Sequence, residues 1–291
     1  MSIKNIKIDK FLAFKNALEI EFCDGVNILI GGNGTGKTTI LRNIYDLSHF
    51  KCFNNKIGIV DFETEEPVFE MKYNSPQEKS NFIFIPETNI LPYSKGLIPL
   101  DEKYNLAFDE YLIDIVKNAQ LPELKKMPEE QQKLLDILSE IIHGTVEYEN
   151  DTFYIVKFSG ERIEFKDEAS GYTRLGLLWK LIRNGLFEPG TVLLWDEPEN
   201  SLNPNVMSTL VDVLFELSRQ GVQIIATTHD EIFAKYFDIN KQEKNKLKYI
   251  SLYKEDGILK YDTDERFDLL KPNNLLNESA EQYLREIEKG I

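Results

Sequence analysis

The sequence predicts an α/β fold in which helices flank a mainly parallel sheet, with an antiparallel β subdomain and an inserted helical lobe. The main observation is a set of apolar runs, at 26–30, 192–195 and 223–228, that are separated by helix-like patterns. Strands buried on both faces of a parallel sheet are apolar throughout, whereas antiparallel strands alternate apolar and polar residues. Alternation at 4–8 and 18–22, and short strands across 57–85, predict the antiparallel part.

Length and composition narrow the class of protein. The chain has 291 residues, of which 42% are hydrophobic and 29% are charged, as expected for one large or two modest globular domains. Its apolar stretches fall short of the ~20 residues of a membrane helix, and the opening MSIKNIKIDK lacks the apolar core of a signal peptide. Cys23 and Cys52, like the three histidines, lack the spacing of zinc ligands. We therefore expect reduced thiols, no structural zinc, no membrane insertion and a cytoplasmic location.

The net charge of -15 is unevenly spread. Residues 61–170 carry 24 acidic and 11 basic groups, and the longest basic run is KQEKNKLK at 241–248. A protein that holds DNA unaided over a broad surface needs a basic stripe that displaces counterions. Binding of nucleic acid stays open through a local groove but is not expected from this chain alone.

Periodicity and turn residues divide the chain into three parts, 1–95, 96–150 and 151–291. The first and third are predicted to form one domain, and the second is the helical insert, with helices at 104–119 and 134–142. The third part should contain a hairpin at 153–158 and 162–165, a helix from about Gly171 and a helix starting at Asn203-Pro204. A second hairpin, 249–253 with 258–261, and a helix from Ser279 with a capping box to Gln282 should close the chain.

A glycine loop lies between the first apolar strand and a helix. Gly31-x4-Gly36-Lys37-Thr38 matches the P-loop pattern in the strand-loop-helix context that the pattern requires. Glycines let backbone N–H groups turn onto the β-phosphate of a nucleotide, Lys37 reaches the β and γ oxygens, and the Thr38 hydroxyl binds Mg²⁺. The predicted nucleotide contacts are Asn33, Gly34, Thr35, Gly36, Lys37, Thr38 and Thr39, which indicates a P-loop NTPase that binds ATP and Mg²⁺.

The run at 192–195 ends in two acids, Asp196 and Glu197. A carboxylate at the C-terminal end of a parallel strand lies beside the P-loop, so Asp196 is predicted to hold Mg²⁺ and Glu197 to polarise the attacking water. Glu199 is either a further acid of this site or a solvated loop residue after Pro198.

With these motifs, the chain resembles the ABC-type ATPase heads of the RecF, SMC and OLD-like families, often described as AAA domains. The resemblance covers nearly the whole chain, through the opening IKIDKFLAFKNALEIEF-x4-NILIGGNGTGKTTIL and through DEPENSLNP at 196–204, which resembles a joined Walker B and D-loop. Thr227-Thr228-His229 resembles the switch segment, and the resemblance implies that His229 contacts the γ-phosphate.

The signature motif departs from the Leu-Ser-Gly-Gly-Gln of ABC proteins. Ala169 to Leu175 is closer to the Ser-Gly-x-x-Arg-Leu variant of OLD-like heads. Ser170 is predicted as the N-cap of the next helix, where Ser170 and Gly171 would meet the γ-phosphate held by a second subunit. The simpler interpretation is a helix cap without a ligand.

The glutamine of the Q-loop is missing. The strand at 82–85 leads into Pro86-Glu87-Thr88-Asn89, and Gln77 precedes that strand. OLD-like relatives resemble the chain in having a proline-rich loop there, so 86–89 is the counterpart without an assigned ligand. Phe11 and Phe14 are candidates for stacking on adenine, although aromatic residues at such positions usually belong to a core.

The resemblance implies an ATPase that dimerises around ATP and acts on a separate effector protein, in phage defence or DNA maintenance. Neither a long coiled coil nor a nuclease domain fits in the sequence, so we expect a stand-alone head. A low-turnover sensor or scaffold that holds an effector is the main alternative. A transporter subunit is disfavoured by the missing glutamine, and DNA repair by the acidic charge.

Overall fold

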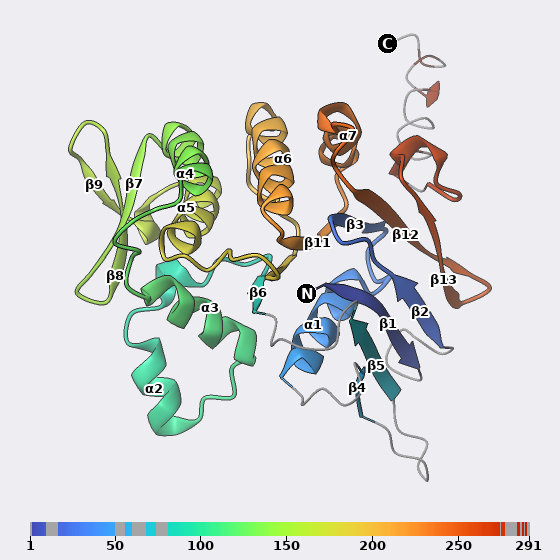
Figure 1. Cartoon of the computed structure of the whole chain (residues 1–291), viewed down its shortest axis with the longest axis horizontal. Coiled ribbons are helices and arrows are strands. Elements are labelled where there is room, and N and C mark those ends of the chain that lie inside the picture. The colour runs from blue at the N-terminus through green and yellow to red at the C-terminus, as the bar shows by residue number, and fades with distance from the viewer. Residues whose placement is uncertain are drawn as a thin grey trace.

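The computed structural model describes residues 2–9, 17–49, 56–59, 68–73, 81–273, 275–276, 284–285, 287 and 289. A six-stranded sheet lies at the centre, in the order β13-β12-β3-β11-β10-β6 (Figure 1). Its strands are β3 (Val26–Gly31), β6 (Phe82–Ile85), β10 (Val192–Trp195), β11 (Gln223–Thr228), β12 (Leu247–Glu255) and β13 (Ile258–Asp264). All neighbours run parallel except β13, which pairs antiparallel with β12. The predicted α/β fold with a mainly parallel sheet is confirmed.

The register of this sheet brings three strand ends together. Trp195 of β10 is paired with Ala226 of β11, and Thr228 of β11 is paired with Ile30 of β3. Because these strands are parallel, the residues that follow them emerge at the same edge of the sheet. The predicted glycine loop, acidic pair and switch histidine all follow these strands.

β6 differs from the prediction. The sequence predicts 82–85 as the last of a set of antiparallel strands. In the structure, β6 pairs parallel with β10 in the central sheet, with Phe82 opposite Val192. The physical reason is burial on both faces, since Ile83 and Phe84 are both almost completely buried. A continuous apolar run of this kind is typical of a parallel strand.

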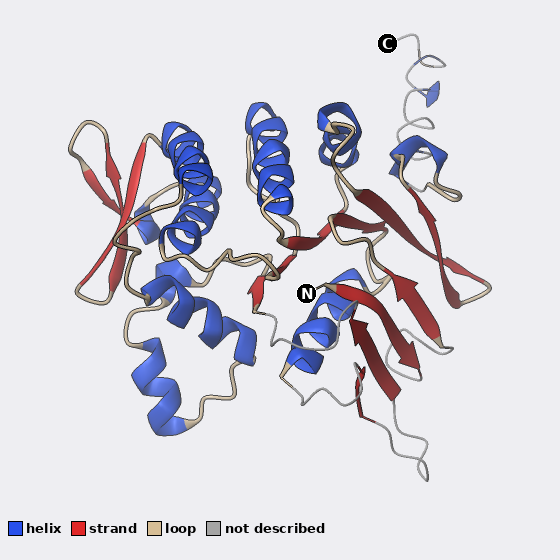
Figure 2. Cartoon of the chain, in the orientation of Figure 1, coloured by secondary structure: helices blue, strands red, loops and turns tan. Residues whose placement is uncertain are grey.

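A second sheet forms the predicted antiparallel subdomain. It has the order β2-β1-β5-β4, with β1 (Ile3–Asp9), β2 (Leu18–Glu21), β4 (Lys56–Ile59) and β5 (Val68–Tyr73). Helix α1 (Lys37–Ser48) lies between this sheet and one face of the central sheet, as Figures 1 and 2 show. Ile40 and Ile44 of α1 belong to the same buried cluster as Ile6 of β1 and Leu194 of β10.

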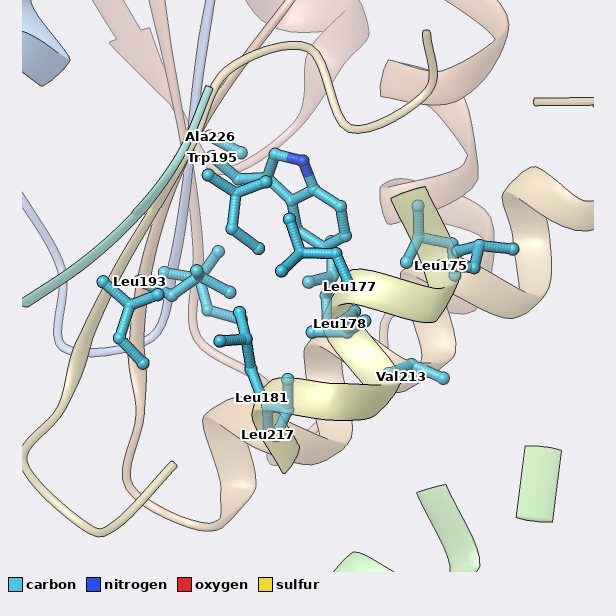
Figure 3. Packing of buried hydrophobic residues seen from close by; sticks show 14 of the residues in the cluster. Leu175, Leu177, Leu178, Leu181, Leu193, Trp195, Val213, Leu217 and Ala226 are labelled. Carbon is cyan, nitrogen blue, oxygen red and sulfur yellow. The ribbon is translucent and has the colours of Figure 1, made fainter. Parts of the chain in front are cut away.

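Three helices cover the other face of the central sheet: α5 (Ser170–Arg183), α6 (Pro204–Arg219) and α7 (Glu231–Asn240). Leu193 and Trp195 point to this side, whereas Val192 and Leu194 point toward α1, because side chains alternate along a strand. Figure 3 shows Trp195 beside Leu177 and Leu178 of α5. The predicted helices from about Gly171 and from Asn203-Pro204 are thus found, and they close the main core.

The inserted lobe contains α2 (Leu97–Tyr104), α3 (Glu110–Gln120) and α4 (Glu129–Ile142). One continuous helix over 104–119 was the prediction, and this is wrong, because the chain leaves the helical conformation at 105–109. Asn105 and Ala107 have positive φ angles of 47° and 56°, which a helix cannot accommodate. Phe108, expected to face inward, is 41% exposed.

A small antiparallel sheet completes the lobe. Its strands are β7 (Gly144–Glu149), β8 (Thr152–Lys157) and β9 (Arg162–Glu164). The hairpin of β8 and β9 turns at Ser159-Gly160 as predicted. Strand β7 is not predicted, because its residues fall within the helical insert expected at 96–150. β7 is short and alternates buried with exposed residues, a weak signal beside the helical pattern that precedes it.

The C-terminal hairpin is formed by β12 and β13 and turns at 256–257, as predicted. The helix expected from Ser279 with Gln282 lies outside the described residues. Short 3₁₀ turns are present at Leu91–Tyr93, Phe165–Asp167 and Phe267–Leu269. Of the helices in the described part of the chain, none combines the length and the apolar character needed to cross a bilayer.

The core of α5 provides a test of this arrangement. Leu178 is completely buried between α5 and the central sheet, so Leu178→Ala should lower the free energy of unfolding by about 2–5 kcal/mol in urea denaturation. Leu100→Ala on α2 is the matched control, because Leu100 is 47% exposed and its truncation should cost about 0.5 kcal/mol or less. Equal losses in the two variants would contradict the burial of α5.

Candidate functional site

The glycine loop is preshaped by its own hydrogen bonds. It joins β3 to α1, and Gly34 and Gly36 adopt φ angles of 74° and 88°, which favour glycine. The Thr35 hydroxyl donates to the Gly32 carbonyl at 2.8 Å. Asn33 and Gly34 are exposed at the tip, and α1 begins at Lys37, so free N–H groups at the helix N-terminus face the loop. This is the geometry of an anion site.

Lys37 lies inside this loop. Its Nζ donates to the Gly31 carbonyl at 2.7 Å, and the residue is 7% exposed. Burial lowers the pKa of Lys37, and the nearby carboxylates Glu197, Asp196 and Glu199 oppose that effect. A buried ammonium satisfied mainly by carbonyl oxygens is well suited to exchange them for phosphate oxygens.

Asp196 joins the P-loop helix to the end of β11. Its two oxygens accept hydrogen bonds from the Thr38 hydroxyl at 3.1 and 2.9 Å, and one also accepts from the Thr227 hydroxyl at 2.5 Å. The two predicted magnesium ligands are therefore in contact. Hydroxyl and carboxylate oxygens are the donor set that Mg²⁺ prefers, so these residues fit the ion.

Glu197 and His229 also meet. The Nδ1 of His229 lies 2.7 Å from Oε1 of Glu197, and the imidazole is half exposed whereas the carboxylate is nearly buried. The backbone N–H of Glu197 donates to the Thr227 hydroxyl at 3.0 Å. The structure thus brings the predicted base and the predicted switch histidine into one pair.

Glu199 is buried rather than solvated, so the interpretation as a loop residue in solvent is wrong. It is 4% exposed and accepts a hydrogen bond from the Thr228 hydroxyl at 2.5 Å. Burial raises the pKa of Glu199 to about 7, although the hydrogen bond from Thr228 acts in the opposite direction. Glu199 therefore carries a proton over part of the neutral range.

Arg174 is the residue of this site whose role the sequence analysis missed. It is 3% exposed, and its Nη2 donates to the carbonyls of Asp196 at 3.1 Å and Glu197 at 2.7 Å, while Nη1 donates to the carbonyl of Glu87. The sequence contains a signal for this role. A permanently charged residue stands within the apolar pattern of the helix from Gly171 onward, and a cation buried there needs hydrogen-bond acceptors. The sequence also gives no indication that Thr227 and Thr228 donate to Asp196 and Glu199.

The N-terminus of α5 packs on the loop that follows Asp196. Ser170 was predicted as the N-cap, but Ala169 occupies that position and Ser170 is the first helical residue, exposed and without a capping hydrogen bond. A Cβ on Gly171 would lie 2.4 Å from the Ser201 carbonyl, which explains the glycine. Among the described residues, Ser170 accepts a hydrogen bond from Thr173 and makes none to the P-loop of the same chain.

The loop after β6 has a structural role in the site. The side chain of Glu87 accepts a hydrogen bond from Asn200 at 3.2 Å, and Asn89 caps the following turn at Leu91. No ligand is assigned to 86–89. Gln77 and the aromatic candidates Phe11 and Phe14 lie outside the described residues, as does Cys52, whereas Cys23 is a free thiol.

One histidine has acidic neighbours that sequence spacing did not reveal. The donor atoms of His49, Glu110 and Asp114 lie within 4.8 Å of one another, where the end of α1 meets α3. The Tyr45 hydroxyl donates to Asp114 at 2.5 Å. The group lies a helix length from the P-loop and takes no part in the site.

The raised pKa of Glu199 gives a testable pH dependence. The unfolded carboxyl ionises near 4.5 and the folded one near 7, so folded protein keeps a proton that unfolded protein releases, and the wild type loses stability as pH rises through this window. Glu199→Gln removes the effect, and its stability relative to wild type should increase by up to about 3 kcal/mol between about pH 4.5 and pH 7.

Urea denaturation without nucleotide at the two ends of that window measures this difference, with the exposed Glu140→Gln on α4 as the control. A Glu199→Gln difference that is the same at both pH values would contradict the buried, protonated carboxyl.

Comparison with known proteins identifies the family of this chain. The family model for "AAA domain, putative AbiEii toxin, Type IV TA system" matches residues 69–234, more than half of the chain. The DNA replication and repair protein RecF of Francisella tularensis subsp. mediasiatica is 32% identical over 80 residues, which cover 27% of this chain and 23% of that protein. RecF of Actinobacillus succinogenes is 32% identical over 71 residues, or 24% and 20%. The chain thus matches less than a quarter of the length of these relatives.

Solved structures share the fold at low identity. The SMC head domain from Thermotoga maritima has a TM-score of 0.53 at 16% identity, covering 91% of this chain and 100% of that one. An ATP-binding cassette of an ABC transporter in its ADP conformation has a TM-score of 0.52 at 14% identity, covering 95% and 98%. The chain shares the P-loop fold of these heads and cassettes, and it belongs to the family described as AAA domain, putative AbiEii toxin, Type IV TA system.

Proposed function

We propose that this chain hydrolyses ATP and uses the cycle as a dimerising switch that acts on a separate protein. The observation that carries the proposal is the convergence of Thr38 with Asp196 and of Glu197 with His229 at one edge of the sheet. Thr38 and Asp196 would hold Mg²⁺, which supplies positive charge for the phosphate oxygens when bound. Lys37 would give up its carbonyl contacts to bind the β and γ oxygens.

The hydrolysis step assigns one proton to Glu197. A water oxygen attacks the γ-phosphorus in line, the bond from that phosphorus to the β–γ bridging oxygen breaks, and Glu197 accepts the proton from the water. His229 would hold this carboxylate through Nδ1 and present Nε2 to the γ-phosphate. The carboxylate and the γ-phosphate both accept hydrogen bonds, so each ring nitrogen of His229 would act as a donor.

Dimerisation is supported by the exposed N-terminus of α5. Ser170 is exposed, and among the described residues it makes no hydrogen bond to the P-loop of its own chain, which leaves the first helical turn available to a nucleotide held by a second copy. Two copies would then sandwich two ATP molecules, with Ser170 and Gly171 of each completing the site of the other.

The partner is proposed to be a protein in the cytoplasm. The family description names a toxin of a toxin–antitoxin system, and the lobe exposes apolar side chains at Leu100 and Tyr104. DNA is not expected from this chain alone, because Lys241 pairs with Glu265 and Lys246 with Asp24 within its basic run. A transporter ATPase subunit remains the less favoured assignment, because 86–89 offers no glutamine.

A second candidate function is a nucleotide-dependent scaffold with negligible turnover. It is favoured by one contact, since His229 occupies the Glu197 carboxylate at 2.7 Å and leaves it less free to face water. Both functions require ATP binding, and the steady-state rate of phosphate release distinguishes them.

Nucleotide binding should depend on Lys37. Lys37→Ala removes the cation that faces the β and γ phosphates, so calorimetry with Mg-ATP should show at least about a 10²-fold loss of affinity, or about 2.7 kcal/mol. Lys133→Ala on the exposed face of α4 is the matched control and should bind ATP as the wild type does. Unchanged affinity in Lys37→Ala would remove the basis of the proposal.

Glu197→Gln should trap ATP. The amide keeps the size of the side chain but accepts no proton, so hydrolysis should slow by about 10²- to 10⁴-fold while ATP stays bound. Light scattering should then show an ATP-dependent dimer. Adding Ser170→Arg should abolish it, because the bulky side chain would collide with the opposing nucleotide and its charge would be repelled by the positive end of α5. A wild-type rate in Glu197→Gln would refute the role of Glu197 and the switch built on it.

A further inference from the structure

We propose that Arg174 is a positioning residue that sets the backbone of Glu197 and thereby aims the carboxylate that accepts the proton. This inference rests on the proposed function, since it assigns a second residue to the same reaction. Arg174 touches no reacting atom. It acts through the main chain of the residue that does.

The guanidinium of Arg174 joins two loops that are far apart in the sequence. Nη2 donates to the carbonyls of Asp196 and Glu197, at the end of β10, and Nη1 donates to the carbonyl of Glu87, after β6. Strands β6 and β10 are neighbours, so their loops emerge side by side, and one planar fork can span both. The three acceptors are main-chain oxygens, so the contact controls backbone position.

The backbone of Glu197 requires such control. Its φ angle is 48°, in the left-handed region that a residue with a side chain rarely adopts. The peptide before it donates to Thr227 at 3.0 Å, and its own carbonyl accepts from Arg174 at 2.7 Å. Such a conformation persists where its surroundings fix it on both sides, and here Thr227 and Arg174 do so. The same conformation directs the Glu197 side chain to His229 at 2.7 Å.

The charges around Arg174 support a role beyond packing. Burial lowers the pKa of Arg174, and the carboxylates of Glu199, Glu87, Asp196 and Glu197 oppose that effect. Its neighbours on the helix, Leu175 and Leu178, fill the core with apolar groups. In the described part of the chain, Nε has no hydrogen-bond partner. A buried cation with one unused donor is a costly way to fill space, and the fork of Nη1 and Nη2 is what an apolar side chain cannot supply.

Steady-state kinetics of Arg174→Ala on the full chain tests the assignment. Misplacing the base should lower kcat by about 10²-fold, whereas KM for ATP should change by less than about threefold, because no contact to the nucleotide is removed. Arg174→Lys keeps the charge but loses the fork, so it should also lose most of kcat and serves if the alanine variant does not fold. Lys180→Ala is the matched control, since Lys180 is a buried cation of the same helix that pairs with Glu123.

Chemical rescue separates positioning from a general structural defect. Guanidinium chloride at low concentration should restore part of kcat in Arg174→Ala, with sodium chloride at equal ionic strength without effect and the Lys180→Ala control unmoved. In the Glu197→Gln background, Arg174→Ala should reduce the rate no further, because it acts through the same carboxylate.

The outcomes distinguish this inference from the proposed function. If Arg174→Ala and Arg174→Lys both keep the wild-type kcat, or if only KM changes, the role of Arg174 is refuted. A slow Glu197→Gln variant would still support the switch. If Glu197→Gln hydrolyses ATP at the wild-type rate, the proposed function itself fails, and the role of Arg174 fails with it.

Discussion

The carboxylate of Asp196 is the constraint on which the rest of the site depends. Its oxygens accept from Thr38 at the start of α1 and from Thr227 at the end of β11, so one side chain fixes the separation of three strand ends. The parallel register makes this possible, because β3, β10 and β11 all present their C-terminal ends at one edge. Each hydroxyl also supplies a donor that a buried carboxylate would otherwise lack. The predicted Mg²⁺ ligands are thus held in place by the hydrogen bonds of the fold.

Buried charges then determine the electrostatics of that edge. Lys37 and Arg174 are both almost fully buried, and burial lowers the pKa of each, while the surrounding carboxylates oppose the shift. Two cations and several acids in one low-dielectric region are stable only while each charge has a partner. Glu199 departs from this balance, because its pKa near 7 lets it hold a proton where another negative charge would be unfavourable.

The sequence predicts the motifs whose own residues lie close together along the chain. The P-loop, Asp196, Glu197 and His229 follow strands with recognisable apolar runs, and the structure brings them together as the parallel topology requires. The direction of β6 depends on pairing with a strand more than a hundred positions away. Arg174 contacts main-chain oxygens 87, 22 and 23 positions away, and periodicity encodes none of these contacts. The break at 105–109 depends on positive φ angles at Asn105 and Ala107, of which only asparagine favours the left-handed region. Whether Ser170 is the cap or the first helical residue turns on one backbone angle.

Helix α5 contacts both the functional site and the inserted lobe. At its N-terminus, Gly171 lies against Ser201 so closely that a methyl group would not fit, which couples the helix to the loop that carries Glu197. Along its length, Trp179 donates to Ser139 of α4 at 2.8 Å, and Lys180 pairs with Glu123 at 2.7 Å. Packed interiors transmit small displacements because they contain little free volume. A displacement of the lobe would therefore be transmitted to α5, which carries the contact between Arg174 and the main chain of Glu197.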